Sequence, residues 1–215
     1  MLGKLTKKES ELSYEARMDI MKGHIEKHVK KLKRGNYKFI PTYEFPSYID
    51  RVSTTEAIDF IDYCKAKDKI NIRHGFEPTT TKSSMKRKLN SGELVVAYYD
   101  VSKGNIQKSM FIDGFCEETR TLYEYYGEYF HGRLDGLNGG LKNKKGNKTY
   151  KQMRIKTIER EDKLRDLFGI SNKVEILPDG SICYGESPGY RLICMWQEQW
   201  YKFSGKEEEK NSYRQ

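Results

Sequence analysis

The segment that most constrains the fold of this chain is residues 108–131, KSMFIDGFCEETRTLYEYYGEYFH. Its aromatic and β-branched residues predict two strands, with the polar residues 117–120 as the turn between them. Asp113 then lies on the first strand, Glu124 on the second, and His131 just past the end of the second strand. Two carboxylates placed in this way are able to hold a hard divalent cation. The segment therefore predicts a metal site on a β-sheet.

Side chains of a strand alternate between its two faces. One face of the second strand is expected to carry Leu122, Glu124, Tyr126 and Glu128, and the other face Tyr123, Tyr125 and Tyr129. On the first strand, Asp113 lies with Phe111 and Phe115. An unpaired carboxylate among aromatic neighbours is costly, so each acid is expected to have a metal or a basic partner. Pairing of Glu124 with a cross-strand lysine is an alternative.

The other elements follow from hydrophobic periodicity and turn residues. Helices are expected over residues 1–34, 53–67 and 150–168, and strands over residues 70–74, 93–102, 174–185 (as a hairpin) and 190–200. Ser53 and Glu56 have the spacing of a capping box at the start of the second helix. The pattern predicts an α/β (α+β) fold with a central mixed β-sheet of about four to five strands flanked by helices.

Three regions are expected along the chain. Residues 1–48 form a basic helical extension and an aromatic, proline-containing linker, residues 49–203 form the main domain, and residues 204–215 form a charged tail. The first helix is interpreted either as a helix that follows a phosphate backbone or as a solvated charged face.

The formal charge of +9, from 40 Lys and Arg against 31 acids, predicts a polyanionic partner. A basic surface with no such role is the alternative. The residues expected to contact nucleic acid are Lys30, Lys31, Lys33, Arg34, Lys86, Arg87, Lys88, Arg133, Lys142, Lys144, Lys145 and Lys148.

The four cysteines are widely spaced, and no pair has the C-x-x-C spacing of a zinc site. No structural zinc is expected, and the cysteines are expected to pack as small buried groups. The N-terminal residues do not resemble a signal peptide, and the longest apolar runs are too short to span a bilayer. We therefore expect a soluble intracellular protein, in the cytoplasm or nucleus.

Five short segments, taken in this order, resemble the PD-(D/E)XK nuclease superfamily. They are residues 70–74 (INIRH), 112–115 (IDGF), 121–132 (TLYEYYGEYFHG), 156–164 (KTIEREDKL) and 189–196 (GYRLICMW). More narrowly, they resemble very short patch repair endonucleases, related homing endonucleases, and restriction-endonuclease-like domains of viral and mobile-element polymerases. The resemblance covers about residues 53–200.

The resemblance implies a restriction-endonuclease-like fold and a DNA endonuclease that uses Mg²⁺, with Mn²⁺ as a substitute. Asp113 and Glu124 would bind the metal, and His131 would assist near the scissile phosphate. The superfamily motif has a lysine where this chain has Tyr126, so Lys156 or Arg160 is expected to supply the cation.

Further residues are weaker candidates for the same site. Glu56, Glu159 and Glu161 are candidate outer ligands, and His74 is a candidate assisting group for which a structural role is the favoured interpretation. Trp196 is followed by Gln197, where relatives carry an acid.

Two alternatives belong to other classes of protein. One is a nucleic-acid-binding module that has lost cleavage. The other is an accessory domain of a replication or recombination complex that uses Tyr43, Phe45 and Tyr48 as contacts. A homodimer is expected if the protein makes double-strand breaks.

Overall fold

The computed structural model describes residues 37–39, 47–49, 53–75, 92–100, 106–132 and 148–206. The helix predicted over residues 1–34 and most of the loops and tail predicted at 77–92, 132–150 and 204–215 lie outside these residues. The fold is mixed α/β, as the sequence predicts.

The main sheet has six strands in the order β3-β6-β7-β10-β9-β8. Their bounds are β3 (Arg73–His74), β6 (Gly114–Cys116), β7 (Thr121–Tyr126), β8 (Val174–Ile176), β9 (Ile182–Gly185) and β10 (Arg191–Trp196). The central strands β7 and β10 are parallel, whereas the other neighbours are antiparallel. The sheet is mixed as predicted, but the expectation of four to five strands is too low because short strands extend both edges.

A second sheet is built around β4 (Glu93–Asp100). β5 (Ile106–Ile112) pairs with β4 over its whole length. β1 (Tyr37–Phe39) and β2 (Ser47–Ile49) pair with opposite ends of β4. The segment expected to be a connector thus contributes two strands, because β4 offers it a second hydrogen-bonding edge.

The chain passes from the second sheet to the main sheet at Asp113, a bend between β5 and β6. The prediction of one continuous strand here is therefore wrong. Gly114, the next residue, lies so close to α3 (Thr55–Asp68) and β3 that an added Cβ would come within 3.0 Å of Ile61 and Ile72. A larger residue would prevent this close approach.

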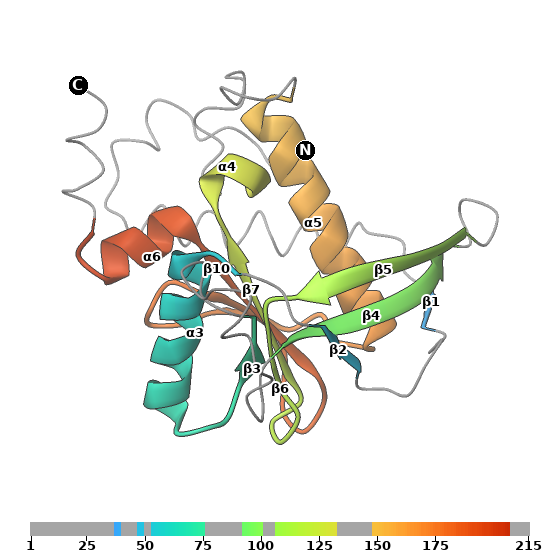
Figure 1. The fold of residues 1–215 in the computed structure, drawn as a ribbon, viewed down its shortest axis with the longest axis horizontal. Coiled ribbons are helices and arrows are strands. Elements are labelled where there is room, and N and C mark those ends of the chain that lie inside the picture. The colour runs from blue at the N-terminus through green and yellow to red at the C-terminus, as the bar shows by residue number, and fades with distance from the viewer. Residues whose placement is uncertain are drawn as a thin grey trace, which may run out of the picture.

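Helices cover both faces of the main sheet (Figure 1). α3 and α6 (Gln197–Phe203) pack on one face, and α5 (Tyr150–Leu167) packs on the other, beside the β4–β5 hairpin. α3 is capped by Thr54, whose hydroxyl accepts from the backbone N–H of Ala57. The prediction that Ser53 is the cap is wrong, because its hydroxyl donates to Glu93 over 3.1 Å.

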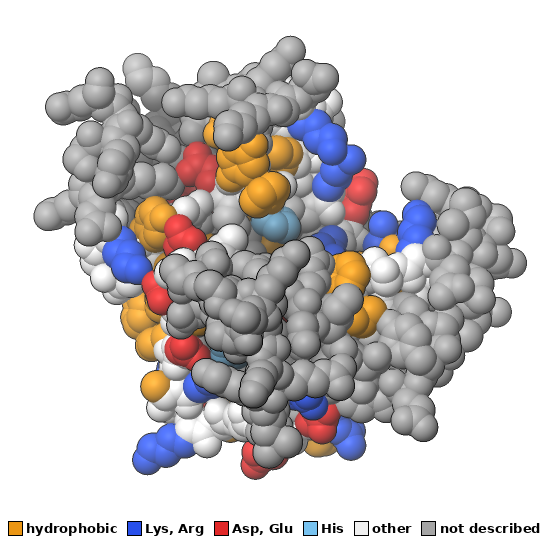
Figure 2. Space-filling model, viewed as in Figure 1, with side chains coloured by type: hydrophobic (Ala, Val, Ile, Leu, Met, Phe, Trp, Pro, Cys, Tyr) orange, Lys and Arg blue, Asp and Glu red, His pale blue; other side chains and the backbone are white. Residues whose placement is uncertain are grey.

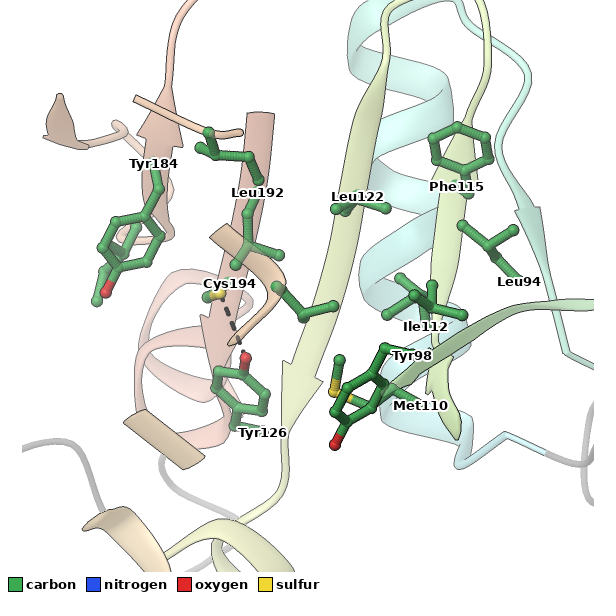
Figure 3. Packing of buried hydrophobic residues seen from close by; sticks show 14 of the residues in the cluster. Leu94, Tyr98, Met110, Ile112, Phe115, Leu122, Tyr126, Tyr184, Leu192 and Cys194 are labelled. Carbon is green, nitrogen blue, oxygen red and sulfur yellow. Dashed lines mark hydrogen bonds between the residues drawn. The ribbon is translucent and has the colours of Figure 1, made fainter. Parts of the chain in front are cut away.

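Each face of the sheet has its own hydrophobic core. Leu122 and Tyr126 of β7 belong to the core under α5, and Tyr123 and Tyr125 belong to the core under α3 and α6. This confirms the predicted alternation along the strand. Figure 3 shows Leu122, Tyr126 and Cys194 in the first of these cores. All four cysteines are buried and reduced, as expected.

β7 and β10 end at the same edge of the sheet, because they are parallel and Tyr126 is in register with Trp196. A short helix, α4 (Glu128–His131), begins after β7, and α6 begins directly after β10. The predicted strands are therefore too long at their C-terminal ends. Within the described residues, no helix is long and apolar enough to cross a membrane.

Candidate active site

The centre of the candidate site is an ion pair between Glu124 of β7 and Arg160 of α5. Arg160 Nη2 lies 2.6 Å from Glu124 Oε1, and Arg160 Nε lies 3.3 Å from Oε2. Arg160 Nη2 also donates to the carbonyl oxygen of Phe111, at the end of β5. One guanidinium thus joins both sheets and α5, a geometry that its fork of donors allows.

Asp113 lies beside this pair because it occupies the bend between the two sheets. Its Oδ2 accepts from the backbone N–H of Tyr125 over 2.9 Å. Asp113 and Glu124 interact electrostatically. The predicted convergence of the two acids is thus present, with Asp113 at a bend instead of within a strand.

Glu124 is a buried acid, and its charged form depends on a nearby cation. Burial raises the pKa of the Glu124 carboxyl to about 8; Arg160 acts against this rise, and Asp113 adds to it. Removing the cation would favour the protonated acid, because desolvation penalises the charged form. The basic partner expected for this acid is therefore Arg160 and not a cross-strand lysine.

His131 lies at the end of α4 and contacts α5 through Thr157. His131 Nδ1 lies 3.0 Å from Thr157 Oγ1, and this hydroxyl donates to the carbonyl oxygens of Met153 and His131 over 3.2 and 3.4 Å. Because the threonine hydrogen is used in this way, its oxygen accepts, and the proton of His131 is assigned to Nδ1. His131 Nε2 is then the basic nitrogen.

His131 is neutral near pH 7. Burial, together with the nearby charge of Arg160, lowers the pKa of its imidazole to about 4. Its ring packs on Tyr126, with 4.8 Å between the ring centroids. On the face drawn in Figure 2, hydrophobic and basic side chains lie next to each other at the surface.

Tyr126 occupies the position where the resemblance expects a lysine, and it is a core residue. Its side chain is fully buried, its hydroxyl lies 3.5 Å from Cys194 Sγ, and its ring packs on Trp196. The ring of Tyr126 therefore packs against the imidazole of His131, and this side chain supplies no cation.

Lys156 is exposed on α5, one residue before Thr157. Its side chain interacts with that of Lys148, and this interaction lowers the pKa of Lys148. The cation that pairs with Glu124 is Arg160, and Lys156 is exposed on α5.

Four candidate residues lie away from the carboxylates. Glu56 accepts from the hydroxyl of Tyr201 over 3.3 Å. His74 Nδ1 lies 2.8 Å from the carbonyl oxygen of Gly75, and its Nε2 lies 2.6 Å from Lys65 Nζ. His74 thus ties β3 to α3 as a neutral side chain.

The two α5 acids also differ from the expected role of outer ligands. Glu159 is exposed, whereas Glu161 is buried and accepts from the hydroxyl of Tyr184 over 2.8 Å. The predicted nucleic-acid contacts Lys30, Lys31, Lys33, Arg34, Lys86, Arg87, Lys88, Arg133, Lys142, Lys144 and Lys145 lie outside the described residues.

The donor atoms around Arg160 suit a hard cation, because two carboxylates and a main-chain carbonyl are all oxygen ligands. Arg160 now fills the position between Glu124 and Phe111. Across the described ranges, no group of three His, Cys, Asp or Glu side chains has a metal-binding arrangement. The oxygens of Asp113, Glu124 and Phe111 would therefore face a divalent metal only if Arg160 moved away from Glu124.

Sequence reasoning missed Thr157 and the carbonyl of Phe111. Thr157 has the helical spacing i, i+3 to Arg160 and so faces the same side of α5. That spacing was the available signal.

Comparisons with protein-family models, curated proteins and solved structures find no match to this chain.

Proposed function

We propose that this chain is a metal-dependent DNA endonuclease with a restriction-endonuclease-like fold. The observation that carries the proposal is that Glu124 and Arg160 pair on the face of β7 that α5 covers, near Asp113 at the bend between the two sheets, with the His131–Thr157 pair also anchored on α5. A buried carboxylate, a half-buried carboxylate and a neutral imidazole are groups that can serve in phosphodiester hydrolysis.

Asp113 and Glu124 would hold Mg²⁺ or Mn²⁺, which would act as a Lewis acid and lower the pKa of a bound water. Arg160, released from Glu124, would then bind a phosphate oxygen, because its planar donors match phosphate geometry. The exposed Lys148 and Lys156 would hold the neighbouring phosphates.

His131 Nε2 would accept the proton of the attacking water. Its proton on Nδ1 is held by Thr157, so the basic nitrogen is in the correct tautomer without a further rearrangement. Burial keeps the imidazole neutral and available as a base near neutral pH.

The proposal is tested by incubating supercoiled plasmid with Mg²⁺ or Mn²⁺ and wild type, Asp113→Asn or Glu124→Gln. Both substitutions keep the shape of the side chain and remove its charge. We expect metal-dependent nicking in wild type and a loss of at least about 100-fold in both variants. Glu175→Gln, on the exposed edge strand β8, is the matched control and keeps wild-type activity.

One observation favours a second function. Arg160 satisfies both oxygens of Glu124 without a metal, which suits a DNA-binding module that does not cleave. Salt-sensitive DNA binding, with no nicking under either metal and no heat of metal binding in calorimetry, would support the module and exclude the enzyme.

A further inference from the structure

α4 lacks the usual means of holding a helix in place. It has four residues, of which Glu128 and His131 are half-buried and none is fully buried, and its N-cap Gly127 has no side chain to cap it. Tyr129 and Phe130 are exposed on its surface. Contacts at its two ends help to set its orientation, and His131 is one of those ends.

At the C-terminal end, α4 rests on the first turns of α5. His131 contacts Thr157, and Gly132 has a positive φ of 79° that places it against the carbonyl of Tyr150. At the N-terminal end, the backbone N–H of Glu128 donates to Gln197 Oε1 over 2.8 Å. Gln197 thus supplies from α6 the cap that Gly127 does not.

The amide of Gln197 has a fixed orientation because its two ends have different partners. Its Oε1 accepts from the Glu128 N–H, so its Nε2 donates to the hydroxyl oxygen of Tyr201 over 2.7 Å. The tyrosine hydrogen then goes to Glu56 Oε1, 3.3 Å away. Three hydrogen bonds run in one direction, from α4 through α6 to the first turn of α3.

We infer that Gln197 and Tyr201 are positioning residues that hold α4, and with it His131, and that Glu56 is the anchor of this chain of hydrogen bonds. The inference rests on the proposed function only in so far as the placement of His131 affects cleavage. It gives Glu56 a role as a hydrogen-bond acceptor, in place of the role of a metal ligand suggested by its sequence position.

Substitutions at Glu56 separate the two roles. Glu56→Gln keeps an oxygen that accepts from Tyr201, whereas Glu56→Ala removes it. We expect plasmid nicking within about twofold of wild type for Glu56→Gln and a fall of about 10-fold or more for Glu56→Ala. Equal loss in both variants would show that the charge of Glu56 is needed and would overturn the inference.

Substitutions at Gln197 and Tyr201 test the rest of the chain. Gln197→Met and Tyr201→Phe are expected to lower kcat by about 10-fold or more, with KM within about twofold, because a misplaced His131 impairs the chemical step. Tyr190→Phe, one residue before the start of β10, is the control for removal of a hydroxyl and should behave as wild type.

A readout that does not need activity is the NMR titration of the His131 imidazole. In folded Gln197→Met we expect the His131 pKa to move up toward its ordinary value, because an imidazole that leaves its pocket is less desolvated. An unchanged titration would overturn the inference. If wild type cleaves no DNA, this titration still decides the positioning role, while the proposed function alone fails.

Discussion

Arg160 places a positive charge beside Glu124 from a helix, whereas Tyr126 fills the strand position where the resemblance expects a lysine. The guanidinium reaches Glu124 because α5 packs on the face of β7 that carries this acid. A lysine would offer a single point charge here, and it could not join Glu124 and Phe111 in one plane.

Replacement of Arg160 is expected to destabilise the protein. Arg160→Met leaves Glu124 buried without its partner, so we expect the free energy of unfolding to fall by about 3–5 kcal/mol, or less where Glu124 takes up a proton. Urea denaturation at pH 9 measures this loss. The double variant Arg160→Met/Glu124→Gln should recover part of it, and no recovery would show that the pair does not carry the effect.

The buried carboxyl of Glu161 is expected to make the free energy of unfolding depend on pH. Burial raises the pKa of its carboxyl to about 7, against the hydrogen bond from Tyr184 and the charges of Arg165 and Arg154. The folded state therefore binds the proton more tightly than the unfolded state, in which the pKa is near its ordinary value. The stability from this group is present at low pH and is lost as pH rises through about 7.

Glu161→Gln removes this titration and keeps an acceptor for Tyr184. Relative to wild type, the variant should gain on the order of 2 kcal/mol of unfolding free energy between pH 5 and pH 8. Urea denaturation at several pH values measures the difference. If the difference in unfolding free energy between Glu161→Gln and wild type stays constant with pH, the pH dependence does not come from Glu161.

At the scale of elements, the junction between α4 and α5 depends on Gly132. Its φ of 79° is unfavourable for other residues, and an added Cβ would lie 2.4 Å from the carbonyl oxygen of Tyr150. We expect Gly132→Ala to lower the unfolding free energy by about 2 kcal/mol or more and to displace His131.

Gly169→Ala is the matched control for this prediction. Gly169 follows α5 with a φ of 61°, and an added Cβ there meets nothing within 4 Å. Gly169→Ala should lower the unfolding free energy by only about 1 kcal/mol, because its Cβ adds conformational strain and no clash. Thermal denaturation compares the two variants, and equal losses would show that the contact with Tyr150 is unimportant.

For the whole molecule, the excess of basic residues predicts strong salt dependence of DNA binding. With a net charge of +9, the affinity for duplex DNA is expected to fall by about 10-fold or more between 50 and 200 mM salt. Fluorescence anisotropy measures the slope. Lys148→Gln/Lys156→Gln should make the slope smaller, and an unchanged slope would place the phosphate contacts elsewhere.

The parts of the fold that could be predicted are those determined by local patterns. The two faces of β7 follow from strict alternation, and α5 follows from its apolar stripe and its terminal glycine. The bend at Asp113 could not be predicted, because it depends on the packing of Gly114 against α3, which is distant in sequence. Strand ends at residues 126 and 196 likewise depend on tertiary register.

Most residues of the candidate site could be predicted from the sequence, but the contacts between them could not. Asp113, Glu124, His131 and Arg160 are all candidates from the sequence, and the structure links Arg160 to Glu124, Asp113 to the backbone next to Glu124, and His131 to α5. The bidentate pair of Glu124 with Arg160 spans 36 residues, and no local periodicity reports on such a distance. The link from Gln197 to Glu128 spans 69 residues and is equally invisible to a local pattern.

The parallel pairing of β7 with β10 has a consequence for the order of events during protein synthesis. The two strands are in register over Thr121–Tyr126 and Arg191–Trp196, so about 64 residues of crossover must be made before they can pair. A ribosome that has completed the carboxylate-bearing strand has not yet made α5 or α6. Non-local pairs of this kind form late, so β7 has no parallel neighbour until the last strand emerges.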